Sequence, residues 1–243
     1  MSSETDVLIV GGGLVGASLA CALGQSGVRT TIVEAYPLGA DQQPGYDERS
    51  IALAQGSQRV FSGLGLWSAL EADVCPIHTI HVSDRGHFGF TRLRREQEGV
   101  PALGYVAAAR VLGRVLQARL QQLETVQVLS PARLAGFHVD DDLVHVDIEH
   151  NEKAQPYTAQ LMVAADGAQS SIREQLGIET LQRDYRQTAI IANVSTDKPH
   201  HNIAYERFTD SGPMALLPMT EQRSALVWTV HADQSEALLA LDD

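Results

Sequence analysis

The sequence predicts an α/β fold in which a βαβ unit is interleaved with a mostly antiparallel β-sheet domain. Residues 6–10 (DVLIV) form a nearly continuous apolar run that predicts a buried parallel strand. Residues 14–25 predict a helix rich in small side chains, and residues 30–34 (TTIVE) predict a second strand. Strand-like segments dominate after residue 125. Among them, the segment that ends at Asp166 is expected to return to the βαβ unit.

The middle of the chain mixes helical and strand patterns. Residues 57–70 predict a helix that is broken near Gly63 and Gly65, and residues 107–123 predict an amphipathic helix. The alternation in residues 77–83 predicts a half-buried strand that pairs with residues 86–93, and HVDDDLVHV predicts a hairpin. Short helices are expected from Ser170 and from Ser235. The remaining strands are expected at 126–129, 134–139, 143–149, 160–164 and, as an antiparallel meander, at 188–195, 203–208, 214–219 and 224–231.

Composition excludes several classes of protein. The 243 residues are 44% hydrophobic and 20% charged, which is typical of a globular protein. A net charge of −12 would repel a phosphate backbone, so nucleic-acid binding is not expected. Cys21 and Cys75 lie far apart and predict no disulfide framework, as in a reducing cytoplasm. The sequence has no signal peptide pattern and no apolar run of the ~18 residues that a membrane helix needs, so a cytoplasmic protein is expected.

The segment GGGLVG predicts a dinucleotide site. Gly11 permits a tight turn, Gly13 removes a side chain that would block a pyrophosphate, and Gly16 lets the helix pack close to the strand. Glu34 ends the second strand, where a carboxylate can accept hydrogen bonds from both ribose hydroxyls and would repel a 2′-phosphate. The alternative is a glycine turn that binds nothing. The motif alone does not distinguish FAD from NAD.

Two further motifs stand in loops. DERS places Arg49 after the second strand, and DGxxSxxR begins at Asp166. In the second motif Gly167 allows a ligand to approach the backbone closely, and Ser170 can cap the helix that leads to Arg173. The simpler interpretations are a surface arginine for Arg49 and a turn-forming aspartate for Asp166.

Taken together, the motifs resemble the class A flavoprotein monooxygenases, and within them the hydroxylases of ubiquinone synthesis, over essentially the whole chain. The resemblance rests on GGGLVG with Glu34, DERSIAL around Arg49, LGYVAAARVLGRVL near Arg110, ADGAQSSIR, and GPMALLPM at residues 212–219. It implies a Rossmann-like FAD-binding domain interleaved with a mostly antiparallel β-sheet substrate domain, as in para-hydroxybenzoate hydroxylase. The expected FAD-binding domain is discontinuous, with residues 1–75 and 100–180; residues 76–99 and 181–243 form the substrate domain.

The resemblance also implies site residues. Arg49 would reach the flavin side of FAD, whereas Asp166 and Gly167 would lie by the pyrophosphate and serve the use of reduced nicotinamide. Arg110 falls near an FAD-contacting position, although AAAR does not match the usual residues there. No catalytic residue and no metal ligand is predicted. The full set of expected cofactor-binding residues is Gly11, Gly13, Leu14, Val15, Gly16, Glu34, Ala35, Arg49, Arg110, Asp166 and Gly167.

The implied reaction is hydroxylation of a polyprenylated phenol, such as a 2-polyprenyl-6-methoxyphenol, in ubiquinone biosynthesis. It would use FAD, NAD(P)H and O2 through a flavin C4a-hydroperoxide, and the cofactor would carry the hard chemistry. The apolar tail would fit peripheral contact with the inner membrane or with a ubiquinone-synthesis complex, without a transmembrane segment.

Several alternatives stay open. Family members continue into a later GD motif that contacts FAD; it is absent here, so we expect a C-terminally truncated chain with an incomplete substrate domain, and an inactive FAD-binding fragment is one alternative. A class A hydroxylase of another small aromatic substrate is a second, and a basic cluster in the substrate domain would favour it. An NAD-dependent dehydrogenase is disfavoured by the DG motif. Sheet packing or a substrate pocket would explain Tyr185, Tyr205 and Phe208.

Overall fold

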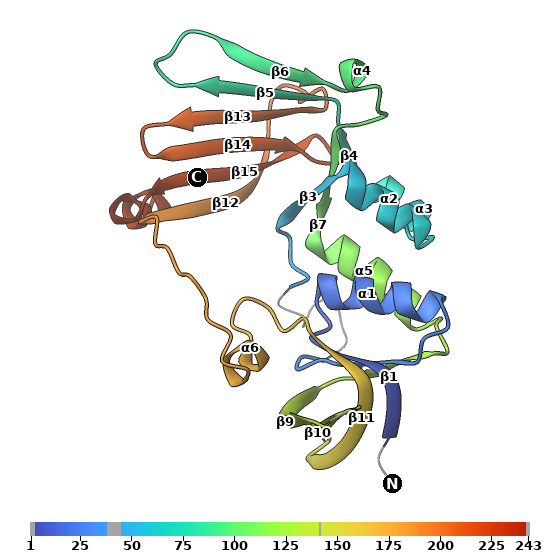
Figure 1. The fold of residues 1–243 in the computed structure, drawn as a ribbon. Coiled ribbons are helices and arrows are strands. Elements are labelled where there is room, and N and C mark those ends of the chain that lie inside the picture. The colour runs from blue at the N-terminus through green and yellow to red at the C-terminus, as the bar shows by residue number, and fades with distance from the viewer. Residues whose placement is uncertain (1–2, 38–44, 141, 242–243) are drawn as a thin grey trace. The chain divides into compact units, whose positions relative to one another are not determined.

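The chain folds into two compact units. The structure, a computed structural model, describes residues 3–37, 45–140 and 142–241 (Figure 1). Unit 1 comprises Met1–Asp47, Leu64–Ala69 and Ala109–Thr180, and unit 2 comprises Glu48–Gly63, Leu70–Ala108 and Leu181–Asp243. These boundaries differ from those of the expected domains, because residues 48–63, 70–75 and 100–108 belong to unit 2.

Unit 1 is built on a six-stranded sheet with the order β8-β2-β1-β11-β10-β9. Its first four strands are mutually parallel, whereas β10 runs antiparallel to both β11 and β9. The return of the segment before Asp166 to the βαβ unit is confirmed by the pairing of β11 with β1. The strands are β1 Ser3–Val10, β2 Thr30–Val33, β8 Val126–Leu129, β9 Ala132–Val139, β10 Val144–His150 and β11 Lys153–Ala164.

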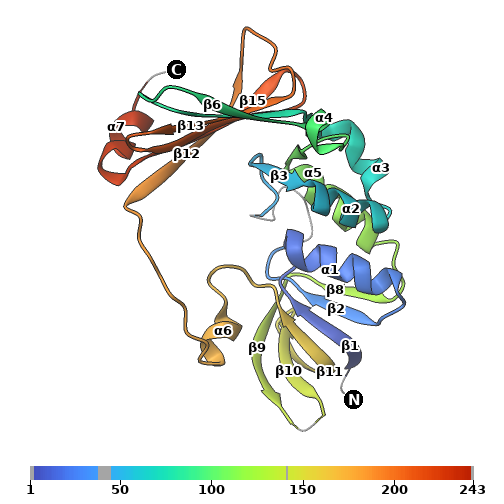
Figure 2. The same ribbon diagram turned by 45° about the horizontal axis from the view of Figure 1, so that its top comes forward.

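Helix α1, Leu14–Gln25, covers one face of this sheet and contacts β1, β2 and β8 (Figure 2). Helix α5, Ala109–Leu120, packs against α1. Small residues on the buried face of α1 allow a close approach: a Cβ on Gly24 would strike Val126 of β8. Since strand side chains alternate, Ile9 of β1 points toward α1 while its neighbours point to the opposite face.

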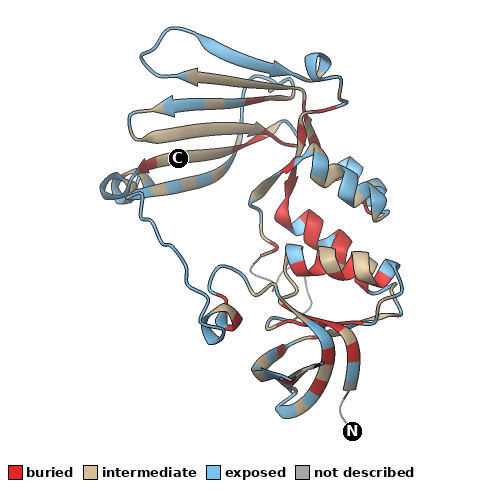
Figure 3. Ribbon diagram, in the orientation of Figure 1, coloured by how far each residue is buried: buried red, intermediate tan, exposed pale blue. Residues whose placement is uncertain are grey.

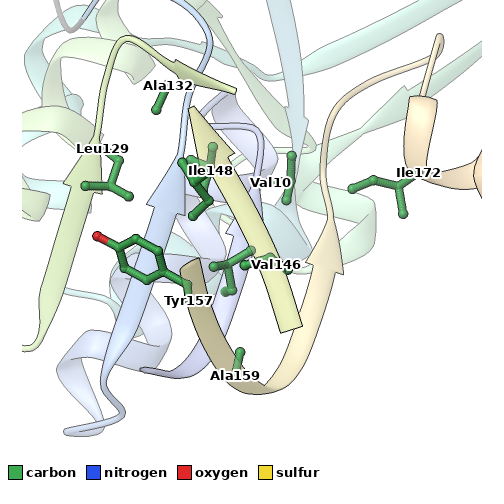
Figure 4. Packing of buried hydrophobic residues seen from close by; sticks show 10 residues of the cluster. Val10, Leu129, Ala132, Val146, Ile148, Tyr157, Ala159 and Ile172 are labelled. Carbon is green, nitrogen blue, oxygen red and sulfur yellow. The ribbon is translucent and has the colours of Figure 1, made fainter. Parts of the chain in front are cut away.

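The opposite face holds a hydrophobic core under the β9–β10–β11 hairpins (Figure 4). Leu8 and Val10 of β1 contribute to it, together with Ile148 and Tyr157 from the antiparallel strands and Ile172 from α6 (Ser171–Gln175). All five are less than one-tenth exposed. Buried residues alternate with exposed ones along these strands (Figure 3). One face of each hairpin strand is therefore in the core, and the predicted hairpin HVDDDLVHV is confirmed.

Unit 2 contains a six-stranded sheet with the order β12-β15-β14-β13-β5-β6 and a three-stranded sheet with the order β3-β7-β4. Ile77 and Val106 of the smaller sheet share a core with Ala204 and Ala225 of the larger one. The strands are β3 Ser50–Ala54, β4 Cys75–Ile77, β5 Thr79–Asp84, β6 Phe90–Arg94, β7 Gly104–Ala108, β12 Gln187–Ser195, β13 Ile203–Thr209, β14 Gly212–Pro218 and β15 Arg223–His231. Its helices are α2 Gln55–Gly63, α4 Arg95–Glu98 and α7 Ser235–Leu239, and α3, Trp67–Leu70, runs from unit 1 into unit 2.

The predicted fold class is confirmed, with differences in detail. The expected meander is only partly formed, because β12 pairs with β15 instead of β13, and β13 pairs in parallel with β5. Strands β3 and β7 were not predicted, since SIALA and GYVAA lack a clear alternation. The expected strand at 77–83 is split at His78 into β4 and β5.

Candidate functional site

The glycine turn between β1 and α1 is fixed by steric constraints. Gly11 has a φ of +105°, and a Cβ there would overlap the Ala165 carbonyl and lie 2.9 Å from the Asp166 nitrogen. A Cβ on Gly16 would overlap the Gly11 carbonyl oxygen and lie 3.2 Å from Cγ2 of Ile9. Both positions therefore need glycine for the fold itself, whether or not a ligand binds.

Gly13 differs from these two glycines. A Cβ at this position would meet no protein atom within 4 Å, and its φ of −64° is open to any residue. Gly13 is also the N-cap of α1, whose first turn has neither a capping side chain nor an acidic residue. The first N–H groups of a helix have no acceptor within the helix, and they favour an anion. The open space next to Gly13, at the N-terminus of α1, is thus suited to bind a phosphate.

Glu34 lies directly beside this turn, just after β2. The residue is 5% exposed, and its Oε2 accepts a 2.6 Å hydrogen bond from the backbone N–H of Gly12. Its Oε1 accepts a second hydrogen bond, of 2.8 Å, from the N–H of Tyr36. A carboxylate oxygen has two lone pairs, so each oxygen can still accept from a ribose hydroxyl. The turn thus holds the carboxylate of Glu34 in place without exhausting its capacity to bind a ligand.

Tyr46 secures the same turn from the other side. Its hydroxyl donates a 2.9 Å hydrogen bond to the carbonyl oxygen of Gly12, and its ring packs on Gly113 of α5, where a Cβ would overlap it. Burial, reinforced by the negative charge of Glu34, raises the pKa of Tyr46 well above its ordinary value. Tyr46 was not predicted as a site residue. Its signal was weak: one tyrosine next to the DERS motif.

The Asp166-Gly167 turn borders the glycine turn. The N–H of Ala165 donates to the carbonyl of Val10 at 2.7 Å, which places the end of β11 beside the end of β1. Gly167 has a φ of +87°, as a close backbone turn requires. The predicted cap is confirmed, because Ser170 Oγ accepts a 3.1 Å hydrogen bond from the N–H of Arg173.

These segments enclose a pocket of about 510 Å³ within unit 1. Six of the expected cofactor-binding residues line it: Gly11, Gly13, Glu34, Ala35, Asp166 and Gly167. The other lining residues were not predicted from the sequence, and Tyr36, Gly45, Arg133 and Ser171 are among them. Arg133, in β9, adds a positive charge, and its side chain has no hydrogen bond or ion pair with any described residue.

The other expected residues lie outside the lining. Leu14, Val15 and Gly16 begin α1 just behind the turn, and Val15 is 76% exposed. Arg110 is exposed in the first turn of α5, where its N–H donates to the carbonyl of Asp47 at 3.0 Å. Arg49 is exposed and belongs to unit 2, directly before β3.

Comparison with known proteins is consistent with this geometry. The profile of the family described as "FAD binding domain" matches residues 4–238. The chain belongs to this FAD-binding family. The pocket fits FAD, since it combines an open helix N-terminus, a glycine with free space before it and a fixed carboxylate. FAD is the cofactor that the family name states, as the sequence predicted.

Two relatives of this FAD-binding chain are named as hydroxylases. It is 39% identical over 236 residues to ubiquinone hydroxylase UbiL of Rhodospirillum rubrum, covering 97% of this chain and 54% of that protein. It is 32% identical to 3-demethoxyubiquinol 3-hydroxylase of Escherichia coli, covering 93% of this chain and 58% of that protein. The chain thus spans a little over half the length of these relatives.

Solved structures show the same fold. The p-nitrophenol 4-monooxygenase PnpA of Pseudomonas putida superimposes with a TM-score of 0.82 at 20% identity, over 98% of this chain and 61% of that one.

Among the described residues of the FAD-binding chain, no helix is both long and apolar enough to cross a bilayer.

Proposed function

We propose that the chain supplies the FAD site of a monooxygenase that hydroxylates a polyprenylated phenol in ubiquinone biosynthesis, with NAD(P)H and O2 as co-substrates. The named hydroxylase relatives support the reaction, and the single observation that carries the site is the carboxylate of Glu34 at the mouth of the glycine turn. We place the protein in the cytoplasm, in peripheral contact with the inner membrane, where its substrate would reside.

Residues around the glycine turn bind the pyrophosphate and the ribose of FAD. The N-terminal N–H groups of α1 donate to the pyrophosphate, and Gly13 leaves it room. Glu34 accepts from the ribose hydroxyls, and Arg133 adds a charge that attracts the phosphates. When bound, FAD supplies the oxygen-transfer chemistry; the protein positions the phenol and excludes water.

Glu34 also determines which dinucleotide the pocket accepts. A carboxylate held by two backbone N–H groups at 2.6 and 2.8 Å cannot swing aside without leaving both donors unpaired. A 2′-phosphate at this ribose would face its negative charge at short range. We therefore assign the pocket to the adenosine of FAD and not to that of an NADP molecule.

The other residues expected from the sequence also contact FAD or position the groups that do. Leu14, Val15 and Gly16 present the helix N-terminus, while Ala35 shapes the adenosine end. Asp166 and Gly167 border the pyrophosphate. Arg49 is assigned to the flavin side of FAD and Arg110 to a peripheral FAD contact; both rest on the family resemblance alone.

The first experiment tests the FAD site. The apoprotein is titrated with FAD while flavin fluorescence is followed, for wild type, Glu34→Gln and the exposed control Glu236→Gln on α7. We expect Glu34→Gln to weaken FAD binding about tenfold, because one charged acceptor becomes neutral, and Glu236→Gln to leave it unchanged. Equal affinities for all three proteins would contradict the assignment of Glu34.

The second experiment tests the reaction. NADPH-dependent O2 uptake and product formation are measured with the FAD-loaded enzyme on a polyprenylated phenol and on the same phenol without its tail. We expect the tailed substrate to be hydroxylated with the higher kcat/KM. Preference for the tail-less phenol would favour the alternative of a small aromatic substrate. No product from either, with FAD bound, would favour the alternative of an inactive FAD-binding fragment and contradict the proposed activity of this chain.

A further inference from the structure

The β5–β6 hairpin of unit 2 combines exposed aromatic rings with arginines. Phe88 in its turn is completely exposed, at 109% of the reference area, and Phe90 is 62% exposed. Every residue of β6 is exposed, and this strand forms one edge of the larger sheet (Figures 1 and 3). Large apolar side chains in water this far from any core are costly unless a partner covers them.

The charge of the hairpin is opposite to that of the chain. Residues 84–96 contain four arginines, Arg85, Arg92, Arg94 and Arg95, against two carboxylates, whereas the whole chain has a net charge of −12. Both carboxylates are already engaged, since Asp84 contacts His87 at 2.9 Å and Glu96 contacts Arg95 at 2.9 Å. Among the described residues, nothing bonds to the side chains of Arg85 or Arg94. Positive charge is therefore available at this surface.

The hairpin is preorganised. The ring of Phe90 stacks on His81 with centroids 5.0 Å apart, and the guanidinium of Arg92 lies 4.6 Å from the centre of the same ring. Arg92 Nε also donates to Nδ1 of His81 at 3.0 Å. Since residues two apart on a strand share a face, Phe90, Arg92 and Arg94 project together.

We propose that this hairpin docks the protein onto the surface of an anionic phospholipid bilayer. Phe88 and Phe90 would enter the boundary between headgroups and acyl chains, and Arg85, Arg92 and Arg94 would contact lipid phosphates. Exposed aromatics beside cationic side chains are the combination that interfacial binding uses. Arginines along β6 disfavour pairing with another strand, so the edge itself is a poor site for strand addition. This inference rests on the peripheral membrane contact of the proposed function and names the surface that makes it; it does not depend on the reaction.

Vesicle binding tests the inference. The purified chain is sedimented with vesicles of phosphatidylglycerol mixed with phosphatidylcholine, and with vesicles of phosphatidylcholine alone. The variants are Phe88→Ala, Arg94→Glu and the control Arg59→Glu, which makes the same charge change at an exposed position of α2. All three sites are exposed, and circular dichroism verifies that each variant is folded.

We expect preferential binding to the anionic vesicles. Phe88→Ala should lower the partition coefficient about tenfold, from the lost apolar area. Arg94→Glu should lower it about 25-fold, because each unit of charge near such a surface changes binding about fivefold. Arg59→Glu should bind within about twofold of wild type. FAD affinity, which reports on the separate pocket of unit 1, should be unchanged in every variant.

Three outcomes would overturn the inference: equal binding of wild type to both kinds of vesicle, wild-type binding by Phe88→Ala and Arg94→Glu, or an equal loss in Arg59→Glu. A fourth outcome is that light scattering shows a dimer of the wild type and that Arg94→Glu dissociates it. The hairpin would then bind a second copy of this chain and not a bilayer. A failure of FAD binding in wild type would instead count against the proposed function alone.

Discussion

Gly13 and Gly16 stand three residues apart in one motif, but the structure predicts opposite consequences for replacing them with alanine. A Cβ on Gly16 would overlap the Gly11 carbonyl oxygen and press on Ile9 at 3.2 Å, so α1 must move away from β1. Such overpacking costs about 1–3 kcal/mol. A Cβ on Gly13 would meet no protein atom within 4 Å, and its φ of −64° suits alanine.

The expected magnitudes follow from these contacts. For a domain of this size 1 kcal/mol corresponds to about 2–4 °C in Tm, so Gly16→Ala should lower Tm by roughly 2–12 °C. Gly13→Ala should shift Tm by no more than about 2 °C. Alanine is a poorer N-cap than glycine, but it also lowers the conformational entropy of the unfolded chain, and these two effects oppose each other. Its methyl group would occupy the proposed phosphate space and displace a charge-assisted hydrogen bond. FAD affinity should therefore fall at least about tenfold.

The assay has two independent readouts. Thermal unfolding of the apoproteins is followed by circular dichroism, and FAD binding is followed by fluorescence titration. If Gly13→Ala binds FAD as wild type does, the open space before that residue is not the phosphate site. If Gly16→Ala melts at the wild-type temperature, the close approach of α1 to β1 does not contribute to the stability of the fold.

Four further predictions concern the same unit and its surroundings. Tyr46→Phe should lose about 1 kcal/mol at neutral pH, seen in chemical unfolding, because the carbonyl of Gly12 loses a donor. The raised pKa of Tyr46 makes the folded state hold its proton above pH 10.0, where the unfolded state loses it; stability should thus fall with rising pH in that range, and less so in Tyr46→Phe. Arg133→Ala should weaken FAD binding about three- to tenfold with little change in Tm, whereas the same change at exposed Arg59 should not. Burial raises the pKa of Cys21 to about 11, so this thiol should react with a disulfide reagent at neutral pH only after unfolding, and labelling of the native chain would contradict that.

The sequence alone determined the βαβ unit and the nucleotide motif. Residues 14–25 were predicted as a helix with the bounds that the structure gives, because a run of small side chains lies between Gly13 and Gly27. The glycine spacing and Glu34 predicted a dinucleotide turn for the same reason: all its parts are local, and their chemistry is readable from residue type. The DG motif and the cap at Ser170 were equally local.

Only the tertiary structure decided which distant segments share the pocket. Arg133 lines the pocket because its strand, β9, pairs with β10 in the sheet of unit 1. Tyr46 reaches the glycine turn because its ring packs on Gly113 of α5. It also decided that β12 pairs with β15 and that Gly13, unlike Gly16, faces open space. Such pairings are set by long-range packing between residues far apart in the chain, and sequence periodicity carries information only about near neighbours.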